Sequence, residues 1–117
     1  TMSASDYIDL LNARQHWIVR MEAALAPYDA LLSPTVPLVA PPIADVAPGA
    51  ERDAEFFRIN ALLLRNTSVV NMLDGCALSL PCHMAGELPV GLMVWHGALH
   101  DDAVLNVGLQ IEQILQK

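Results

Sequence analysis

The chain has 117 residues, enough for one domain with a core of its own, and its 13 acidic against 6 basic residues give a net charge of −7. This acidic balance argues against non-specific nucleic-acid binding, which depends on basic side chains that neutralise phosphates. No apolar run approaches the roughly 20 residues that a bilayer span requires, so the composition also argues against a membrane helix.

Apolar residues make up 54% of the sequence, above the roughly 45–50% that is usual in globular proteins. We expect the excess to lie on a surface that docks against a missing part of the same protein or against a second copy. Scattered surface leucines are the alternative.

The N-terminus and the two cysteines indicate in which cellular compartment the protein is expected to fold. No secretory signal is visible, and two cysteines do not make a disulfide framework, so a reduced, cytoplasmic setting is expected. Thr1 stands ahead of Met2, which suggests a cut or engineered start.

Residues 5–26 are predicted to form an amphipathic helix. Apolar side chains recur at three-, four- and seven-residue spacings, at Ile8, Leu11, Ile18, Met21 and Leu25. Ser3 or Ser5 can cap the start of this helix, and Pro27 stops it. The short apolar run at 29–33 then predicts a buried strand.

Residues 35–52 are predicted to form a proline-rich loop. Pro37, Pro41, Pro42 and Pro48 fix φ and donate no backbone hydrogen bond, which favours an extended, ordered path across a surface. Disorder is the alternative that the composition leaves open.

A second helix is predicted from Asp53, which can cap it, to about Met72. Phe56, Ile59 and Val70 share one stripe that neighbouring leucines widen, so this helix is expected to be nearly central.

Residues 76–80 and 90–95 are predicted to be strands with apolar residues on both faces, which implies a sheet covered on both sides. The connecting loop is too short for a crossover helix, so the two should form an antiparallel hairpin. A last helix begins at Asp101 or Asp102, and Gly108 should mark its close approach to the sheet.

The predicted order is therefore helix, strand, loop, helix, strand, strand and helix, which defines a mixed α/β class. Three strands cannot carry helices on both faces and remain apolar on both sides unless further strands continue the sheet. We expect residues 1–117 to form a single portion of a larger fold.

Candidate metal ligands lie close in sequence at Cys76, Cys82, His83, His96 and His100. Structural zinc sites usually show paired ligands at both ends, and a turn is favoured between the last two histidines. We therefore predict neither a metal site nor another cofactor.

The sequence also gives little support for a catalytic cysteine or serine. Cys82 and His83 are adjacent, and neighbouring side chains in an extended chain point to opposite faces, so the imidazole could not easily take the thiol proton. Ser33, Ser68 and Ser79 stand outside any G-x-S-x-G elbow. The residues by themselves predict no catalytic site.

Five short motifs nevertheless follow one another along the chain. They are Ser5-Asp6-Tyr7 with Arg14; Tyr28 to Pro37 with its Pro34-Thr35-Val36-Pro37 turn; Asn66-Thr67 and Asn71 with Leu78-Ser79-Leu80-Pro81; Leu88-Pro89-Val90-Gly91-Leu92; and residues 101–115. Their order and spacing resemble the C-terminal region of the amidase signature enzymes, a family of serine hydrolases.

Two departures from the family pattern matter. His83 stands where the family usually has glycine, so the loop between the last two strands is expected to be less tight. The family's Gly/Ser-rich segment, which supplies two catalytic serines and a lysine, has no counterpart here, and the only lysine is Lys117. The resemblance therefore implies no catalytic residue in this chain.

The resemblance implies the C-terminal part of an amidase, which hydrolyses carboxamide C–N bonds of small molecules through an acyl-serine intermediate. This part would complete a mixed sheet and wall the substrate pocket while being inactive by itself. Thr35 and Asn71 are expected near the substrate, because loops at strand and helix ends line such sites. Turn and cap hydrogen bonds are the alternative for these two residues. A non-catalytic, self-associating interaction module is the alternative for the whole chain.

Overall fold

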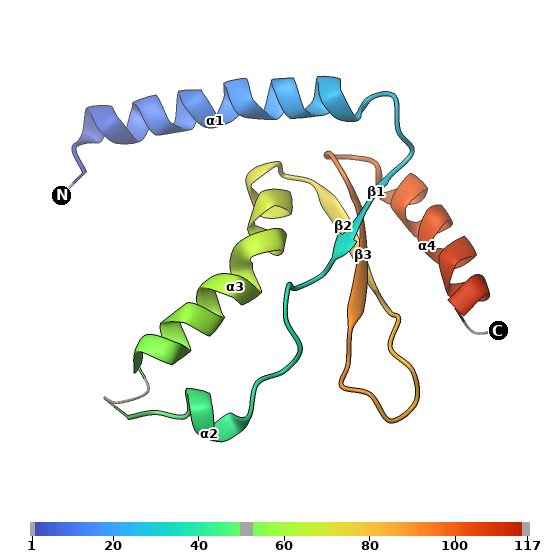
Figure 1. Ribbon diagram of the computed structural model, residues 1–117. Helices are drawn as coiled ribbons and strands as arrows, with labels where there is room; N and C mark the ends of the chain where they lie inside the picture. Colours follow the sequence, from blue (N-terminus) through green and yellow to red (C-terminus); the bar gives the residue numbers. More distant parts are fainter. Residues whose placement is uncertain (1, 50–52, 116–117) are drawn as a thin grey trace.

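The computed structural model describes residues 2–49 and 53–115. Within them the elements run α1 (Ala4–Leu25), β1 (Leu31–Pro34), α2 (Ile43–Val46), α3 (Asp53–Met72), β2 (Cys76–Pro81), β3 (Gly91–His96) and α4 (Asp101–Leu115) (Figure 1). The mixed α/β class and the predicted order are confirmed. Thr1 and Lys117 lie outside the described residues. Asp53, which was expected to cap the second helix, is instead the first residue of α3.

A capping box starts α1. The Ser3 hydroxyl accepts a hydrogen bond from the Asp6 backbone N–H at 3.2 Å, and the Asp6 carboxylate accepts one from the Ser3 N–H at 2.9 Å. These bonds satisfy two donors that the first helical turn leaves unpaired. The Ser3 hydroxyl, which also donates to this carboxylate, holds the pKa of Asp6 below its ordinary value. Ser3 rather than Ser5 is therefore the cap.

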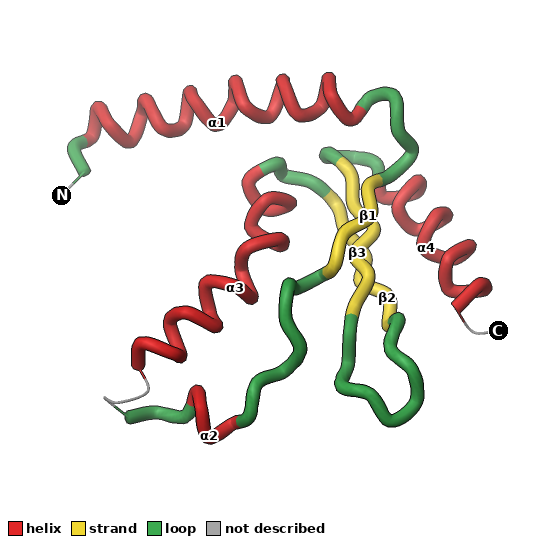
Figure 2. Tube along the Cα trace, viewed as in Figure 1, coloured by secondary structure: helices red, strands yellow, loops and turns green. Residues whose placement is uncertain are grey.

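The sheet has three strands in the order β1-β3-β2, and both neighbouring pairs are antiparallel. Figure 2 shows the three strands gathered in the middle of the molecule. The hairpin predicted between the last two strands is confirmed. Met93 of the central strand lies between Ser33 on one side and Ser79 on the other. This register decides which side chains share a face of the sheet.

Helices cover the two faces of the sheet very differently. On one face Val104 of α4 packs against Leu80 and Val94. A Cβ at Gly108 would collide with Leu78, so the predicted close approach of this glycine to the sheet is confirmed. Along the length of α4, this face is well covered.

The opposite face of the sheet is covered only where α1 and α3 reach it. Met93 and Trp95 pack there against the C-terminal half of α1 and the C-terminal end of α3, and the buried helix-side residues are Ile18, Leu25, Val70 and Leu73. Beyond these contacts the two helices diverge (Figure 1). The radius of gyration is 17.6 Å, compared with about 13 Å for a compact chain of this length.

The expectation that α3 is nearly central is wrong for this chain. Ile59 and Val70 are buried, but Phe56, Phe57 and Leu64 are exposed. The apolar stripe exists as the sequence indicated, yet most of its length has no element of the described chain to pack against.

The proline-rich segment also differs from its prediction, because it contains a single helical turn, α2, where only loop was expected. Pro42 precedes this turn with φ −55°, a value that proline holds and that suits a helix start. Strand β1 begins two residues later than predicted, since the chain turns after α1 through a bond from the Tyr28 N–H to the Leu25 carbonyl. Among the described residues, none of the helices has the length and apolar character needed to cross a bilayer.

Candidate functional site

Two hydroxyl groups meet across the central strand of the sheet. Thr35 follows β1 and donates its backbone N–H to the Gly91 carbonyl at 2.8 Å. Ser79 belongs to β2, on the other side of Gly91, and its Oγ lies 2.6 Å from Thr35 Oγ1. The two side chains meet because Gly91 carries none: a Cβ there would lie 2.6 Å from the Ser79 oxygen and 2.7 Å from the Thr35 oxygen.

The hydroxyl pair lines an open hollow of about 350 Å³ beside the β2–β3 loop. Its wall is formed by Thr35, Val36, Ser79, Pro81, His83, Pro89, Val90 and Gly91. The hollow therefore combines a mostly apolar rim with two hydroxyls and one imidazole, a mixture typical of small-molecule sites.

Backbone hydrogen bonds shape the loop that holds His83. The Cys82 N–H donates to the Val90 carbonyl at 3.0 Å, and the Val90 N–H donates to His83 Nδ1 at 3.4 Å. Because Nδ1 accepts this bond, the proton of the neutral imidazole is on Nε2. These two hydrogen bonds join the two ends of the loop, although histidine replaces the glycine of the family pattern.

The chemistry open to the hydroxyl pair is binding. One hydroxyl donates to the other, which leaves the second O–H free to donate to a carbonyl or carboxylate oxygen. Within the described residues, neither hydroxyl hydrogen-bonds to an imidazole, amine or carboxylate that could take its proton. The arrangement therefore lacks the base that an activated serine requires.

An amide side chain links α3 to this region. Asn66 donates its Nδ2 to the Pro34 carbonyl at 2.8 Å, immediately before Thr35. In the sequence, Asn66 stood out only as part of a family motif, and the structure gives it a positioning contact. It holds the end of β1 against the middle of α3.

Asn71, the other residue expected near the substrate, lies at a different place. Its side chain is exposed, and its backbone carbonyl accepts a bond from Arg14 at 3.4 Å. Arg14 also pairs with Asp74 at 2.6 Å, where α1 meets the C-terminal end of α3. In the part of the chain that the structure describes, no contact joins Asn71 to the hydroxyl pair.

The side chains of both cysteines, and of the two histidines that flank the turn after β3, form hydrogen bonds with backbone atoms. His96 is buried; its Nδ1 accepts from the Gly97 N–H at 2.7 Å and its Nε2 lies 3.1 Å from the Tyr28 carbonyl. Its ring stacks on His100 with centroids 3.8 Å apart. The thiols of Cys76 and Cys82 each donate to a carbonyl. Residues 2–49 and 53–115 contain no cluster of three side chains suited to a metal.

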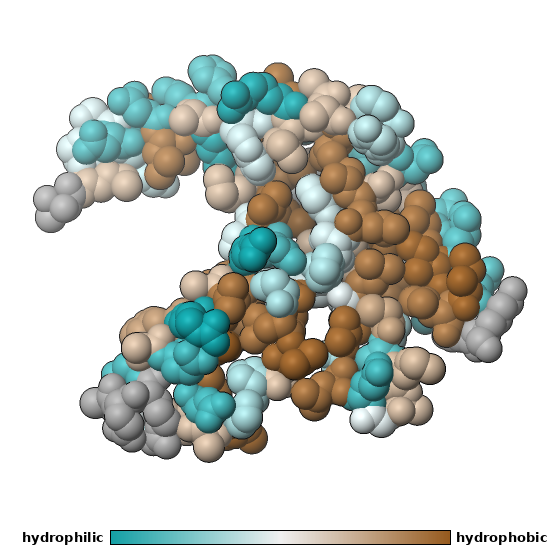
Figure 3. Space-filling view, viewed as in Figure 1, coloured by the Kyte–Doolittle hydropathy of each residue, from teal (hydrophilic) through white to brown (hydrophobic). Residues whose placement is uncertain are grey.

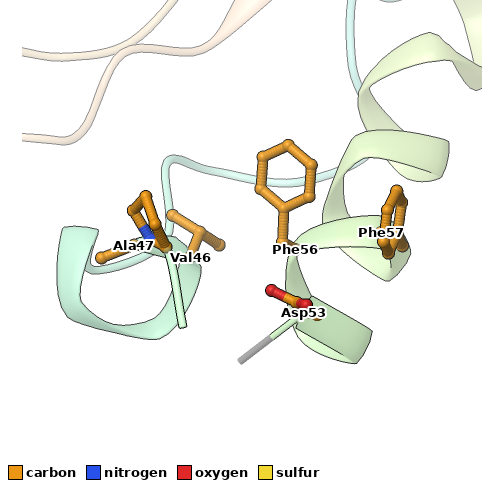
Figure 4. A pocket seen from close by; sticks show the side chains of 6 residues that line it. Val46, Ala47, Asp53, Phe56 and Phe57 are labelled. Carbon is orange, nitrogen blue, oxygen red and sulfur yellow. The ribbon is translucent and has the colours of Figure 1, made fainter. Parts of the chain in front are cut away.

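A second hollow, of about 300 Å³, lies between α2 and the start of α3. Its lining includes Val46, Ala47, Asp53, Phe56 and Phe57, and the two phenyl rings meet edge to face at 5.5 Å (Figure 4). Apart from one carboxylate, its lining is apolar, so it offers few groups that could bind a polar ligand or take part in a reaction.

One ion pair lies beside this second hollow. Glu55 and Arg58 pair at 2.7 Å, and this contact lowers the pKa of Glu55 and raises that of Arg58. The pair is exposed and lies within α3, so it stabilises the helix start rather than a ligand.

Sequence reasoning missed Ser79 and Gly91 as members of the site. It treated Ser79 only as an unsupported nucleophile, and it used Gly91 only as part of a motif. Strand alternation was the available signal, since residues of neighbouring strands on one face come together once the register is known. That register was not predictable, because β1 had not been assigned a neighbour.

Several known proteins are similar to this chain. The family model described as Amidase matches residues 1–105. A glutamyl-tRNA(Gln) amidotransferase subunit of Saccharolobus solfataricus is 31% identical over 95% of this chain and 22% of the relative. The amidotransferase subunit of the same description from Streptomyces avermitilis is 36% identical over 78% of this chain and 17% of the relative. A 2-amino-5-chloromuconic acid deaminase of Comamonas testosteroni is 31% identical over 74% of this chain and 18% of the relative.

The chain therefore spans about a fifth of the length of these curated relatives. No solved structure matches it significantly.

Proposed function

The chain belongs to the amidase family, and we propose that it forms the C-terminal part of an enzyme that hydrolyses non-peptide carboxamide C–N bonds. The reaction would proceed through an acyl-serine intermediate whose serines and lysine come from polypeptide outside residues 1–117. The chain itself would be inactive, would need no cofactor, and would bind neither nucleic acid nor membrane. We also propose that the protein is cytoplasmic, because both cysteines are free thiols.

The observation that carries this proposal is the match of the Amidase family to residues 1–105, together with the placement of the hydroxyl hollow within that range. Thr35 and Ser79 offer a free O–H donor at the rim of the hollow, which suits the oxygen of a small-molecule carboxamide. Neither is beside a base, which agrees with a binding role and with chemistry supplied from elsewhere.

Of the two residues expected near the substrate, Thr35 is proposed as a substrate contact. Asn71 is proposed as a second one in the complete enzyme, reached from the exposed end of α3. Its bond from Arg14 uses only the backbone carbonyl, which leaves its amide side chain available.

A non-catalytic, self-associating module is the second candidate function. It rests on the many apolar side chains exposed along α1 and α3. The family match supports the first proposal more directly, because an enzyme part buried by the rest of its own chain would show the same exposed surface.

A chimera tests the proposal. This chain would replace the matching segment of the S. solfataricus protein, and ammonia release from a simple carboxamide would be measured for the chimera and for its Ser79→Ala and Thr35→Val variants. We expect hydrolysis, with KM raised several-fold in the variants and kcat nearly unchanged. A folded chimera without hydrolysis, or variants that lower only kcat, would contradict the proposal.

A further inference from the structure

The hollow beside the β2–β3 loop presents two kinds of hydrogen-bond donor to a ligand, a hydroxyl and an imidazole N–H. We propose that it selects carboxamides that also carry a carboxylate, and that His83 is the residue that determines this specificity. The free hydroxyl of Thr35 and Ser79 would donate to the amide oxygen, and His83 Nε2 would donate to the carboxylate. This inference rests on the proposed function and names the substrate class as the monoamides of dicarboxylic acids.

The imidazole of His83 has one nitrogen left for a ligand. Pro81 of β2 pairs with Gly91 of β3, and the Val90 N–H next to that pair donates to His83 Nδ1 at 3.4 Å. The ring is therefore held beside the strand end where the two hydroxyls meet. In the neutral ring the proton is then on Nε2, and within the described ranges no protein group accepts it.

The acceptors around the hollow are already engaged. The Gly91 carbonyl accepts the Thr35 N–H at 2.8 Å, and the Val90 carbonyl accepts the Cys82 N–H at 3.0 Å and the Cys82 thiol at 3.5 Å. Of the two hydroxyl oxygens, one accepts from the other. The groups left for a ligand are donors, which pair with oxygen acceptors rather than with an ammonium group.

The lining of the hollow also favours a negative charge. The chain has 13 acidic residues, yet none is among the described residues that line the hollow. Glu87 of the adjoining loop lies outside the lining, and its carboxylate accepts the Met84 N–H at 2.9 Å. A hydrogen bond from an imidazole to a carboxylate is charge-assisted and stronger than one to a neutral carbonyl, so a carboxylate is the favoured second group.

The hollow is accessible and suited to a small acid. The β2–β3 loop projects from the sheet (Figure 1), and Figure 3 shows hydrophilic and hydrophobic surface side by side over it. The volume of about 350 Å³ lies within the roughly 300–1,000 Å³ of small-molecule sites. The methylene groups of such an amide would contact Val36, Pro81 and Pro89 in the same lining.

The family pattern places glycine where this chain has His83. Glycine carries no side-chain donor, so the proposed preference is a property of this chain rather than of the family. His83→Gly therefore removes the donor while giving the loop the residue of the family pattern. His83→Gln is the conservative variant, since its amide keeps one donor group and one acceptor.

Binding to the 117-residue chain tests the inference without catalysis. The ¹⁵N-labelled chain would be titrated with succinamate and with butyramide, which has as many carbons but no carboxylate. We expect the N–H signals of Thr35, Val90 and Gly91 to shift at about tenfold lower concentrations of succinamate, the effect of one charge-assisted hydrogen bond. His83→Gly should abolish this preference. His16→Ala is the matched control on α1, which contributes no residue to the hollow, and it should leave the preference unchanged.

The chimera with the S. solfataricus protein gives a second readout. In it, His83→Gly should raise the KM for succinamate about tenfold, with kcat and the KM for butyramide nearly unchanged. His83→Gln should retain part of the preference for succinamate in both experiments, whether or not the glycine variant folds.

Several outcomes would overturn the inference. They are equal shifts with the two amides, no shift with either, a preference that survives in His83→Gly, and a folded His83→Gln chain without any preference. Preferential binding of succinamate without hydrolysis by a folded chimera would support the carboxylate site and contradict the proposed function. Hydrolysis of both amides with equal KM would support the proposed function and contradict the inference.

Discussion

Thr35 Oγ1 and Ser79 Oγ lie 2.6 Å apart, although 44 residues separate them in the chain. The contact exists because Thr35 directly follows one outer strand and Ser79 belongs to the other, and Gly91 of the central strand between them leaves the space free. It therefore reports on the register of all three strands at once, and it forms the polar part of the proposed site.

Gly91→Ala is expected to destabilise the chain by about 1–3 kcal/mol, because the new methyl group would push the two hydroxyls apart. Urea unfolding followed by circular dichroism measures the change. Gly97→Ala is the control, since its Cβ would meet only the Glu22 side chain at an ordinary 3.6 Å. Equal costs for the two variants would contradict the role given to Gly91.

The coupling between the two hydroxyls can be measured directly. A double-mutant cycle of Thr35→Val and Ser79→Ala should give a coupling free energy of about 0.5–1.5 kcal/mol, the net value of one hydrogen bond. Additive effects of the two changes would show that the hydroxyls do not bond in solution.

The pair of Arg14 with Asp74 should contribute modestly to stability and depend on salt. Both side chains are partly exposed, so Arg14→Met, which retains the apolar stem, should cost about 0.2–1 kcal/mol at low ionic strength. The cost should shrink at about 1 M salt, where charges at the surface are screened over a few ångströms. A cost that is unchanged by salt would indicate packing rather than charge.

Acid should weaken the start of α1. Hydrogen bonds from Ser3 lower the pKa of Asp6 in the folded chain below its ordinary 3.8, so the stabilisation is present above that value and is lost as the pH falls through the lower folded pKa. Asp6→Asn cannot titrate, so the stability difference between the original chain and this variant should shrink below about pH 3.8. Unfolding measured across this range tests it, and a difference that stays constant would contradict the capping role. Glu55 titrates with the same sign in both proteins and cancels in the comparison.

Local patterns predicted the elements of this fold well. Both ends of α1 were predicted to within two residues, from the Ser3 cap, the apolar spacing and the proline that follows the helix. The antiparallel hairpin was predicted from the short loop before Gly91. The single turn at Ile43–Val46 was missed, because four residues are too few for a periodic pattern and proline appears in both loops and helix starts.

The tertiary relationships were harder to predict. The apolar stripe of α3 indicated burial, but a stripe does not reveal whether its cover belongs to the same chain. Thr35 was singled out from its place at a strand end, whereas Ser79 and Gly91 needed the pairing of β1 with β3, a contact between segments about 60 residues apart that no local signal encodes. Asn71 was chosen on the same grounds as Thr35, yet it lies at the junction of α1 with α3.

The central claim is that this chain belongs to an amidase but cannot catalyse by itself. Ammonia release from a simple carboxamide by the purified 117-residue chain tests it most directly, with the Ser33→Ala, Ser68→Ala and Ser79→Ala variants beside it. We predict no hydrolysis above the buffer rate for any of the four proteins, because none of Ser33, Ser68 and Ser79 hydrogen-bonds, within the described residues, to an imidazole, amine or carboxylate that could take its proton. Hydrolysis by the unmodified chain that one of these serine changes abolishes would contradict the account.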